Sequence, residues 1–293
     1  MTREGNSTPF SRPPLETLPL AKDRWTPIYL EHGRVEVDDS AIKWVGADGT
    51  VCPLPVATIT AVLLGPGTTV THAAVKATSQ CNCPIFWVGA DGLRFYASGV
   101  GMNHDNGMAR KQARVWATAK SRNNIARKMF KFRFGEEPPA DANVPRLMGM
   151  EGKRVKKTYA DLGEKYGVTW KGRNYSPTNW QLSDGINKAI SAANASLYAM
   201  TAAVCCSMGF IPQLGFVHQS GPMAFVYDIA DLYKTTTSMP AAFEATALGK
   251  NDTEELARKL LKRNIEKLQV LKNMPKDILE ILGDSPQQDQ NPH

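Results

Sequence analysis

The sequence predicts an α+β multidomain protein in which an N-terminal β-sandwich-like domain is followed by an all-α domain. Short β-type runs separated by turn signals fill the first hundred residues. Beyond about residue 106 the apolar periodicity becomes helical. A length of 293 residues allows one large domain or two modest ones, and a composition with 42% hydrophobic and 22% charged residues excludes a disordered, collagen-like or disulfide-stapled chain.

The N-terminal part divides into a proline-rich leader, residues 1–20, which we expect to be flexible, and a β domain over residues 21–100. Its expected elements are apolar runs bounded by Gly, Pro and Asp, with strands at 25–30, 34–37, 41–45, 51–54, 59–64 and 84–88 and one helix at 70–80. Trp-Val-Gly-Ala-Asp-Gly occurs at 44–49 and again at 87–92, and each copy predicts an Asp-Gly hairpin turn. Two similar hairpins or chance both explain the repetition.

A glycine-containing linker at 98–106 precedes the α-helical domain, predicted over 106–284. Its expected helices carry apolar stripes at helical spacing and lie at 106–134, 144–166, 186–208, 223–234, 240–248, 253–272 and 275–282. Ser183 or Asp184 can cap the long apolar helix, which Gly209 ends. A small hairpin is expected around Lys171, and the polar tail at 285–293 is expected to be disordered.

The positive charge is concentrated in one segment. The chain has 35 Lys and Arg against 28 Asp and Glu, but residues 106–175 hold 17 of the basic and only 6 of the acidic residues. Such a field typically faces a polyanion, because neutralising phosphates releases counterions. A solvated helix face is the alternative interpretation.

A cytoplasmic chain without a membrane span is expected. The leader lacks the apolar core of a signal peptide. The longest apolar stretch, Ile190 to Met208, is interrupted by Asn194, Ser196, Tyr198 and Thr201, which is wrong for a bilayer core. The five cysteines form neither a disulfide framework nor a CxxC zinc pair, so we expect reduced, structural thiols.

The chemistry that remains is a set of carboxylates and one histidine. The sequence contains no P-loop, GxSxG or HExxH motif. His218 precedes Asp228 and Asp231, which lie at i and i+3 on one predicted helix face, and Glu151 opens a run of basic residues. Such a set suits Mg²⁺ or Mn²⁺ in phosphoryl transfer, although helix-decorating aspartates and a structural histidine are the alternative interpretation.

Several stretches taken together resemble one known family. They are Met150-Glu151-Gly152 before basic residues and Tyr159, Gly215-Phe216-Val217-His218, Phe225-Val226-Tyr227-Asp228-Ile229-Ala230-Asp231, Leu64-Gly65-Pro66-Gly67-Thr68, Arg94-Phe95-Tyr96-Ala97-Ser98-Gly99 and Tyr166-Gly167-Val168-Thr169-Trp170. From about Pro19 to Phe243 the chain resembles the CRISPR-associated integrase (Cas one), the catalytic subunit of the spacer-acquisition complex, and specifically its Cascade-paired type I-E branch.

The resemblance implies a β domain that forms a homodimer and a helical catalytic domain. It implies that Glu151, His218 and Asp228 bind Mg²⁺ or Mn²⁺, with Asp231 as an accompanying acidic residue. It also implies a four-to-two complex with a small ferredoxin-like subunit (Cas two). This complex would bind a short DNA duplex with single-stranded ends and join its 3′ hydroxyls to the CRISPR repeat.

The DNA-binding residues expected from the basic segment are Arg110, Lys111, Arg114, Arg122, Lys128, Lys131, Lys153, Arg154, Lys156 and Lys157. By resemblance Lys76 and Arg94 are added. His32 occupies a place where relatives can carry an aromatic residue that stacks on the duplex end, and a histidine ring can also stack.

Two alternatives to an integrase remain. A structure-selective DNA endonuclease would use the same ion with water as the nucleophile. A non-catalytic DNA-binding scaffold would use the acidic residues only to cap helices.

Overall fold

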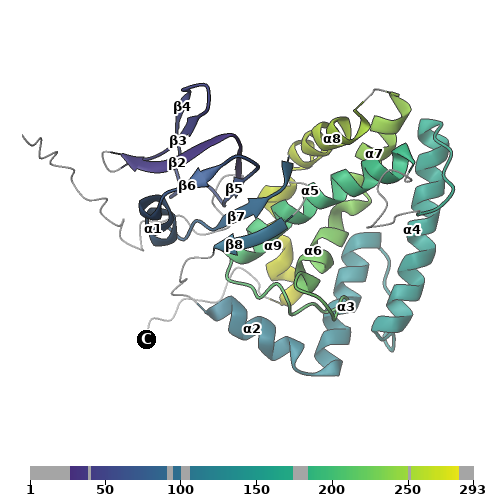
Figure 1. Ribbon diagram of the computed structural model, residues 1–293. Helices are drawn as coiled ribbons and strands as arrows, with labels where there is room; N and C mark the ends of the chain where they lie inside the picture. The colour runs from purple at the N-terminus through teal and green to yellow at the C-terminus, as the bar shows by residue number, and fades with distance from the viewer. Residues whose placement is uncertain are drawn as a thin grey trace, which may run out of the picture.

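The computed structural model describes residues 27–38, 41–90, 95–99, 106–173, 184–249 and 252–283. The strands among them are β1 (Ile28–Leu30), β2 (Gly33–Asp38), β3 (Ala41–Gly46), β4 (Val51–Pro53), β5 (Val62–Leu64), β6 (Thr69–Val70), β7 (Ile85–Val88) and β8 (Phe95–Gly99). The helices are α1 (His72–Gln80), α2 (Gly107–Trp116), α3 (Ala119–Phe134), α4 (Val144–Tyr166), α5 (Gly185–Ser207), α6 (Ala224–Lys234), α7 (Ser238–Ala247), α8 (Thr253–Lys267) and α9 (Val270–Leu282). The predicted order, a β region followed by a largely helical region, is confirmed (Figure 1).

The β region consists of two four-stranded sheets. One has the order β1-β5-β7-β8, with its first three strands parallel, and the other has the order β4-β3-β2-β6. The first Asp-Gly turn is confirmed between β3 and β4, where the Gly46 amide donates to the Thr50 carbonyl at 2.8 Å and Gly49 has a φ of +83°. The corresponding turn after β7 includes residues 91 and 92, which lie outside the described residues.

The central strands β5 and β7 of the sheet β1-β5-β7-β8 are covered on both faces. Val62 and Leu64 of β5 point into a core shared with the second sheet and α1, whereas Leu63 between them points into the core of the helical region. On β7, Ile85 points into the core shared with the second sheet, and Phe86 points into the core of the helical region. Because successive side chains of a strand point to opposite faces, a continuous apolar run is what a doubly covered parallel sheet requires. The β region and the helical region therefore share a core, and the predicted domain division near residue 100 stays a prediction.

Two expected helices have different bounds in the structure. The helix predicted over 106–134 breaks into α2 and α3, because the side chain of Thr118 caps α3 by accepting from the Ser121 amide at 3.2 Å. The break predicted before Pro275 instead lies at Gln269, which has a φ of +51°, and Pro275 lies inside α9. At the hairpin expected near Lys171, the described residues 171–173 contain no strand.

Helix α5 is the central helix of the helical region and packs against α6, α7 and α8. Asp184 caps it, accepting from the Asn187 amide at 3.0 Å, while Ser183 lies outside the described residues. It is the one described helix long and apolar enough to cross a membrane, but 67% of its most apolar stretch is buried inside the protein. Its hydrophobicity is accounted for by the core that it forms.

Candidate active site

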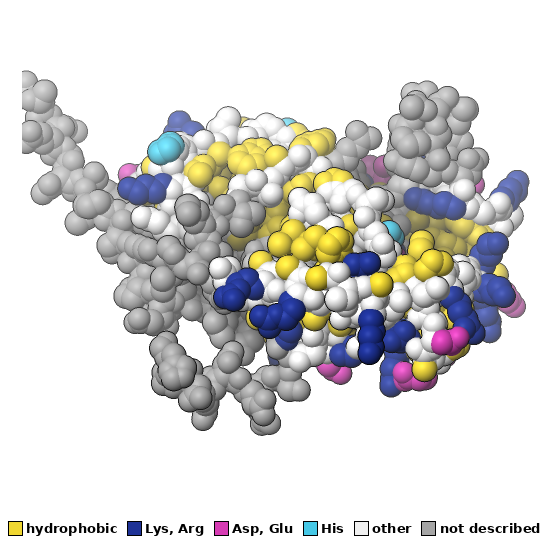
Figure 2. All heavy atoms as spheres, turned by 90° about the horizontal axis from the view of Figure 1, so that it is seen from below, with side chains coloured by type: hydrophobic (Ala, Val, Ile, Leu, Met, Phe, Trp, Pro, Cys, Tyr) yellow, Lys and Arg dark blue, Asp and Glu magenta, His cyan; other side chains and the backbone are white. Residues whose placement is uncertain are grey.

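Helices α2, α3 and α4 carry a surface rich in Lys and Arg. Figure 2 looks onto this side and shows many basic side chains with few Asp and Glu among them. We define the basic face as the exposed members of the predicted DNA-binding set on these helices, which are Arg110, Arg114, Lys128, Lys131, Lys153, Lys156 and Lys157.

Three other predicted contacts of these helices are partly buried: Lys111, Arg122 and Arg154. Arg122 donates to the Trp116 carbonyl at 2.7 Å and lies over the Trp116 ring, so it also stabilises the end of α2. Arg154 is paired with Glu136 and packs on Phe130.

The remaining predicted contacts are spread over the β region. Lys76 is exposed on α1, and His32 is exposed in the turn between β1 and β2 with a φ of +52°. Arg94 lies outside the described residues. The basic face therefore belongs to the helical region alone.

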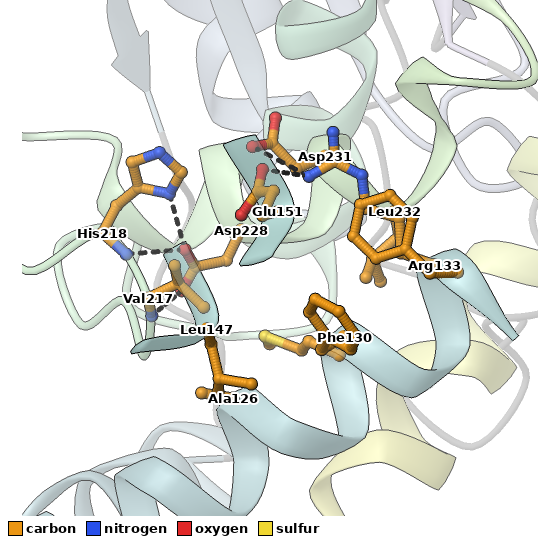
Figure 3. A pocket seen from close by; sticks show the side chains of 12 residues that line it. Ala126, Phe130, Arg133, Leu147, Glu151, Val217, His218, Asp228, Asp231 and Leu232 are labelled. Atoms are coloured by element: carbon orange, nitrogen blue, oxygen red, sulfur yellow. Dashed lines mark hydrogen bonds and ion pairs between the residues drawn. The ribbon is translucent and has the colours of Figure 1, made fainter. Parts of the chain in front are cut away.

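A pocket opens where α3, α4, α6 and the loop before α6 meet (Figure 3). It is lined by Ala126, Met129, Phe130, Arg133, Phe134, Leu147, Glu151, Val217, His218, Asp228, Asp231 and Leu232. The four predicted catalytic residues thus lie in one place, although almost 80 residues separate the first from the last. Its apolar walls lower the local dielectric, which strengthens interactions between charges inside it.

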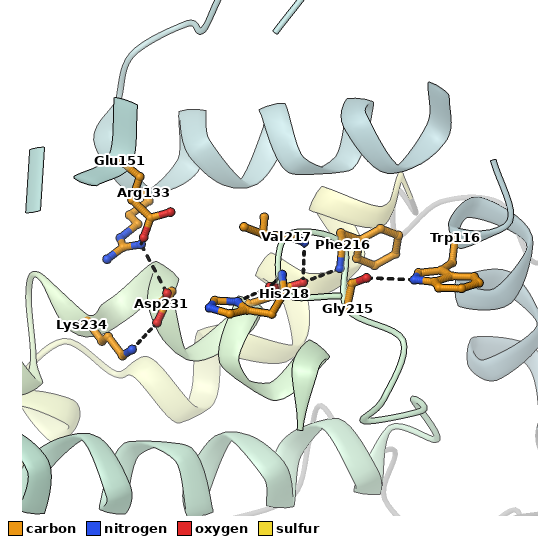
Figure 4. A network of polar contacts seen from close by, with 10 residues as sticks. Trp116, Arg133, Glu151, Gly215, Phe216, Val217, His218, Asp231 and Lys234 are labelled. Carbon is orange, nitrogen blue, oxygen red and sulfur yellow. Dashed lines mark hydrogen bonds and ion pairs between the residues drawn. The ribbon is translucent and has the colours of Figure 1, made fainter. Parts of the chain in front are cut away.

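The loop that carries His218, residues 209–223, is fastened to α2. The fully buried Gln112 donates to the carbonyls of Ile211 and Leu214, both at 3.0 Å, and accepts from the Ile211 amide at 2.8 Å. The Trp116 indole donates to the Gly215 carbonyl at 2.9 Å (Figure 4). Helix α2 therefore presents basic residues outward and holds the loop on its inner side.

Asp228 of α6 fastens the same loop from the other side. Its carboxylate accepts from three consecutive backbone amides, those of Phe216, Val217 and His218, the latter two at 3.0 and 2.9 Å. Its Oδ1 atom also forms a hydrogen bond with the Nδ1 atom of His218, at 2.8 Å. Gly215 is required beside this clamp, because a Cβ atom there would lie 2.1 Å from the His218 carbonyl oxygen.

The two members of the His218–Asp228 pair perturb one another. Its hydrogen bond to Asp228 raises the pKa of the His218 imidazole, against the opposing effect of partial burial. Burial raises the pKa of the Asp228 carboxyl, which the hydrogen bonds from His218 partly counteract. Since Nδ1 of His218 is used by this pair, its Nε2 atom is the ring nitrogen available to a ligand.

Glu151 and Asp231 share one cation. Nη1 of Arg133, at the end of α3, is ion-paired with Glu151 and lies 3.6 Å from Oδ2 of Asp231 (Figure 4). Asp231 is also paired with Lys234, whose ammonium lies over the Tyr198 ring. Burial lowers the pKa of Lys234, but Asp231 and Tyr198 more than offset this, so the net shift is upward.

The pocket contains three carboxylates and one imidazole, donor types that suit a hard divalent cation. The buried guanidinium of Arg133 lies between two of the carboxylates, those of Glu151 and Asp231. In the described part of the chain no three His, Cys, Asp or Glu side chains are close enough together to hold an ion. Asp228 is the predicted ligand that fits least, since both of its oxygens face loop amides or His218. Asp231, predicted as an accompanying residue, is the aspartate that lies beside Glu151.

Gln112, Trp116, Arg133 and Lys234 are site residues that the sequence reasoning did not single out. Arg133 lies near Glu151 and Asp231 only through tertiary packing, whereas Lys234 lies beside Asp231 on the same helix. Lys234 could have been found from the sequence, because it lies three residues after Asp231 on the same predicted helix face, the spacing of an ion pair.

The chain is similar to known proteins of one family. Residues 133–267 match the family model described as CRISPR associated protein Cas1. The chain is 43% identical to CRISPR-associated endonuclease Cas1 2 of Chlorobaculum tepidum, over 92% of this chain and 91% of the relative. It is 40% identical to CRISPR-associated endonuclease Cas1 of Escherichia coli K12, over 95% and 93%. Among solved structures, that titled "Crystal structure of TtCas1-DNA complex" superimposes with a TM-score of 0.75 at 35% identity, over 90% of this chain and 98% of the other. The chain belongs to the CRISPR-associated Cas1 family.

Proposed function

We propose that this chain is a metal-dependent DNA integrase of CRISPR adaptation, which joins the 3′-hydroxyl ends of prespacer DNA to the CRISPR repeat by transesterification. The observation that carries the proposal is the convergence of Glu151, His218 and Asp231, from three separate elements, on one pocket next to the basic face. Exchange of one phosphodiester for another needs no nucleotide hydrolysis, which agrees with a sequence without a P-loop.

In this proposal Glu151, His218 and Asp231 hold Mg²⁺ or Mn²⁺, and Asp228 is a positioning residue that keeps His218 in place. A bound ion of this kind supplies Lewis-acid polarisation of the scissile phosphate. The chain contributes the two carboxylates beside Arg133, the Nε2 atom of His218 and a largely apolar wall that limits water. Asp228, predicted from the resemblance as a ligand, remains the alternative third ligand.

The basic face is the proposed seat of the DNA phosphates, with Lys76, Lys111, Arg122, Arg154 and the undescribed Arg94 as further contacts. A relative with 35% identity has been crystallised in complex with DNA. We also propose that His32 stacks on a duplex end.

The proposed assembly is cytoplasmic. Two homodimers, formed through the β domain of residues 21–100, flank a dimer of the small ferredoxin-like subunit, and the chain belongs to the type I-E branch. The basis is the resemblance of its motifs and the fold it shares with Cas1.

Hydrolysis is the second candidate reaction, because the curated relatives are named endonucleases. An endonuclease would use the same pocket and ion, with water in place of the 3′ hydroxyl. A scaffold without catalysis is the third candidate.

The test uses labelled donor duplexes with free or dideoxy-blocked 3′ ends, a plasmid carrying a repeat, and Mn²⁺. The integrase predicts covalent joining of free ends and no joining of blocked ends. Joining that ignored the block would refute the mechanism, and cleavage without joining would favour the endonuclease.

Site variants separate catalysis from scaffolding. Glu151→Gln, His218→Gln and Asp231→Asn are expected to abolish joining while DNA binding is kept. Glu164→Gln, an exposed glutamate on the same helix as Glu151, is the matched control and should join normally. Unchanged joining by all three site variants would remove the pocket from the mechanism.

A further inference from the structure

Arg133 is the residue of the site whose role is unassigned. Its side chain is only 5% exposed although arginine is normally a surface residue, and a single nitrogen, Nη1, faces both Glu151 and Asp231. Two neighbouring carboxylates in a pocket repel each other unless a cation lies between them. The guanidinium therefore stands where the charge of the two carboxylates demands a cation (Figure 3).

One hydrogen-bond donor of the Arg133 guanidinium has no partner within the described part of the chain. Its Nε–H is buried and has no hydrogen-bond partner among the described residues, although a buried donor without a partner is unfavourable. Arg133 also lies one residue before the end of α3, on a long and flexible side chain. Arg127 on the same helix donates to the Ala142 carbonyl at 3.0 Å. The polar contacts of Arg133 are instead with the acidic pair, and its guanidinium also lies over the Phe134 ring.

We propose that Arg133 is a built-in placeholder for the divalent cation: in the metal-free protein it neutralises Glu151 and Asp231, and a metal ion must displace it in order to bind. This inference rests on the proposed function, since it takes Glu151 and Asp231 as ligands. Arg133 thereby prevents repulsion from opening the empty site, and it lowers the apparent affinity for the metal by competing with it. It is a positioning residue, because it acts through the two carboxylates.

A phosphate-binding role fits the geometry less well. A side chain that is 5% exposed and directed at two carboxylates offers its charge to them rather than to DNA. Arg154, on the neighbouring helix, is 28% exposed and lies in the stretch proposed to hold phosphates, so the fold distinguishes the two arginines.

The test measures Mn²⁺ alone binding to the metal-free full-length protein, by the electron paramagnetic resonance signal of free Mn²⁺. Arg133→Met, which keeps an unbranched apolar stem and removes the charge, is expected to bind Mn²⁺ at least about tenfold more tightly, because one charge-assisted contact no longer competes. The melting temperature of this variant in EDTA should fall below that of the wild type. Saturating Mn²⁺ should raise the melting temperature of the variant by more than it raises that of the wild type. Arg127→Met, which removes an arginine of α3 outside the acidic pair, is the matched control and should leave Mn²⁺ affinity unchanged.

Equal or weaker Mn²⁺ binding by Arg133→Met would overturn the inference, since it would mean that the guanidinium stays beside the metal or does not face it. If the methionine variant does not fold, Arg133→Gln serves instead, because it keeps a donor toward the carboxylates without a charge, and the same tightening is expected. Glu151→Gln separates the two levels of the argument. If the wild type shows no Glu151-dependent Mn²⁺ binding, the proposed function fails. If it does and neither Arg133 variant tightens binding, only the placeholder role fails.

Discussion

Replacement of Asp228 by asparagine tests whether this residue holds the loop that carries His218. Its carboxylate is fully buried and accepts from three backbone amides and faces Nδ1 of His218. An asparagine side chain has one oxygen and one NH₂ group, so whichever way it turns, a donor faces a backbone donor. The charge that these amides stabilise is lost as well.

The expected loss of stability follows from these contacts. Breaking a buried charged network of this kind costs about 3–5 kcal/mol. For a chain of 293 residues that corresponds to a fall in melting temperature of roughly 5–10 °C. The measurement is thermal unfolding of Asp228→Asn in EDTA, where no divalent ion contributes.

Asp277→Asn is the matched control. Asp277 is half-buried and accepts from the Tyr233 hydroxyl at 2.7 Å, a bond that an asparagine oxygen can also accept. Its melting temperature should move by about 2 °C or less, the effect of roughly one ordinary hydrogen bond. A melting temperature for Asp228→Asn within that range would refute the loop-anchoring role and return Asp228 to the ligand set.

Three further outcomes are expected. Gly215→Ala should destabilise the protein by about 1–3 kcal/mol in EDTA and weaken Mn²⁺ binding, because its Cβ would displace the His218 carbonyl; wild-type values for both would contradict the close approach. Arg114→Gln should reduce the slope of log affinity for DNA against log salt by about 0.9, while Lys262→Gln on α8 should leave it unchanged, and equal effects would argue against the basic face. At pH 8 one thiol of the native protein, that of the exposed Cys52, should react with Ellman's reagent. The other four thiols are buried, and burial raises the pKa of Cys206 to about 12. Cys52→Ser should remove this reaction, and several fast-reacting thiols would contradict the described packing.

Much of the fold follows from local sequence patterns. The continuous apolar runs of β5 and β7, the aspartate before α5 and the apolar stripe of α5 each depend on nearby residues only. The break between α2 and α3 was missed because the apolar stripe continues across it, while the Thr118 side chain favours a new helix start.

The site shows where local reasoning ends. The i, i+3 spacing correctly indicated that Asp228 and Asp231 share a helix face, but spacing cannot tell which carboxylate meets backbone amides and which meets a cation. That division is decided by the loop at 215–218 and by Arg133, which reach α6 from about 10 and 98 residues away along the chain. Likewise the contacts of Gln112 with Ile211 and Leu214 span about a hundred residues and leave no local pattern.

Helix α2 connects the basic face rigidly to the loop that carries His218. Its ten residues carry basic side chains on the outside, and its Gln112 and Trp116 hold the loop of His218 on the inside. A rigid helix of this length spans about 15 Å. With the proposed function, the distance from a phosphate bound on α2 to the imidazole of His218 is therefore set by a helix rather than by a loop. Positional accuracy in choosing the phosphodiester then depends on side chains that touch neither the DNA nor the ion, and substitutions at Gln112 or Trp116 are expected to move the point of joining before they reduce its rate.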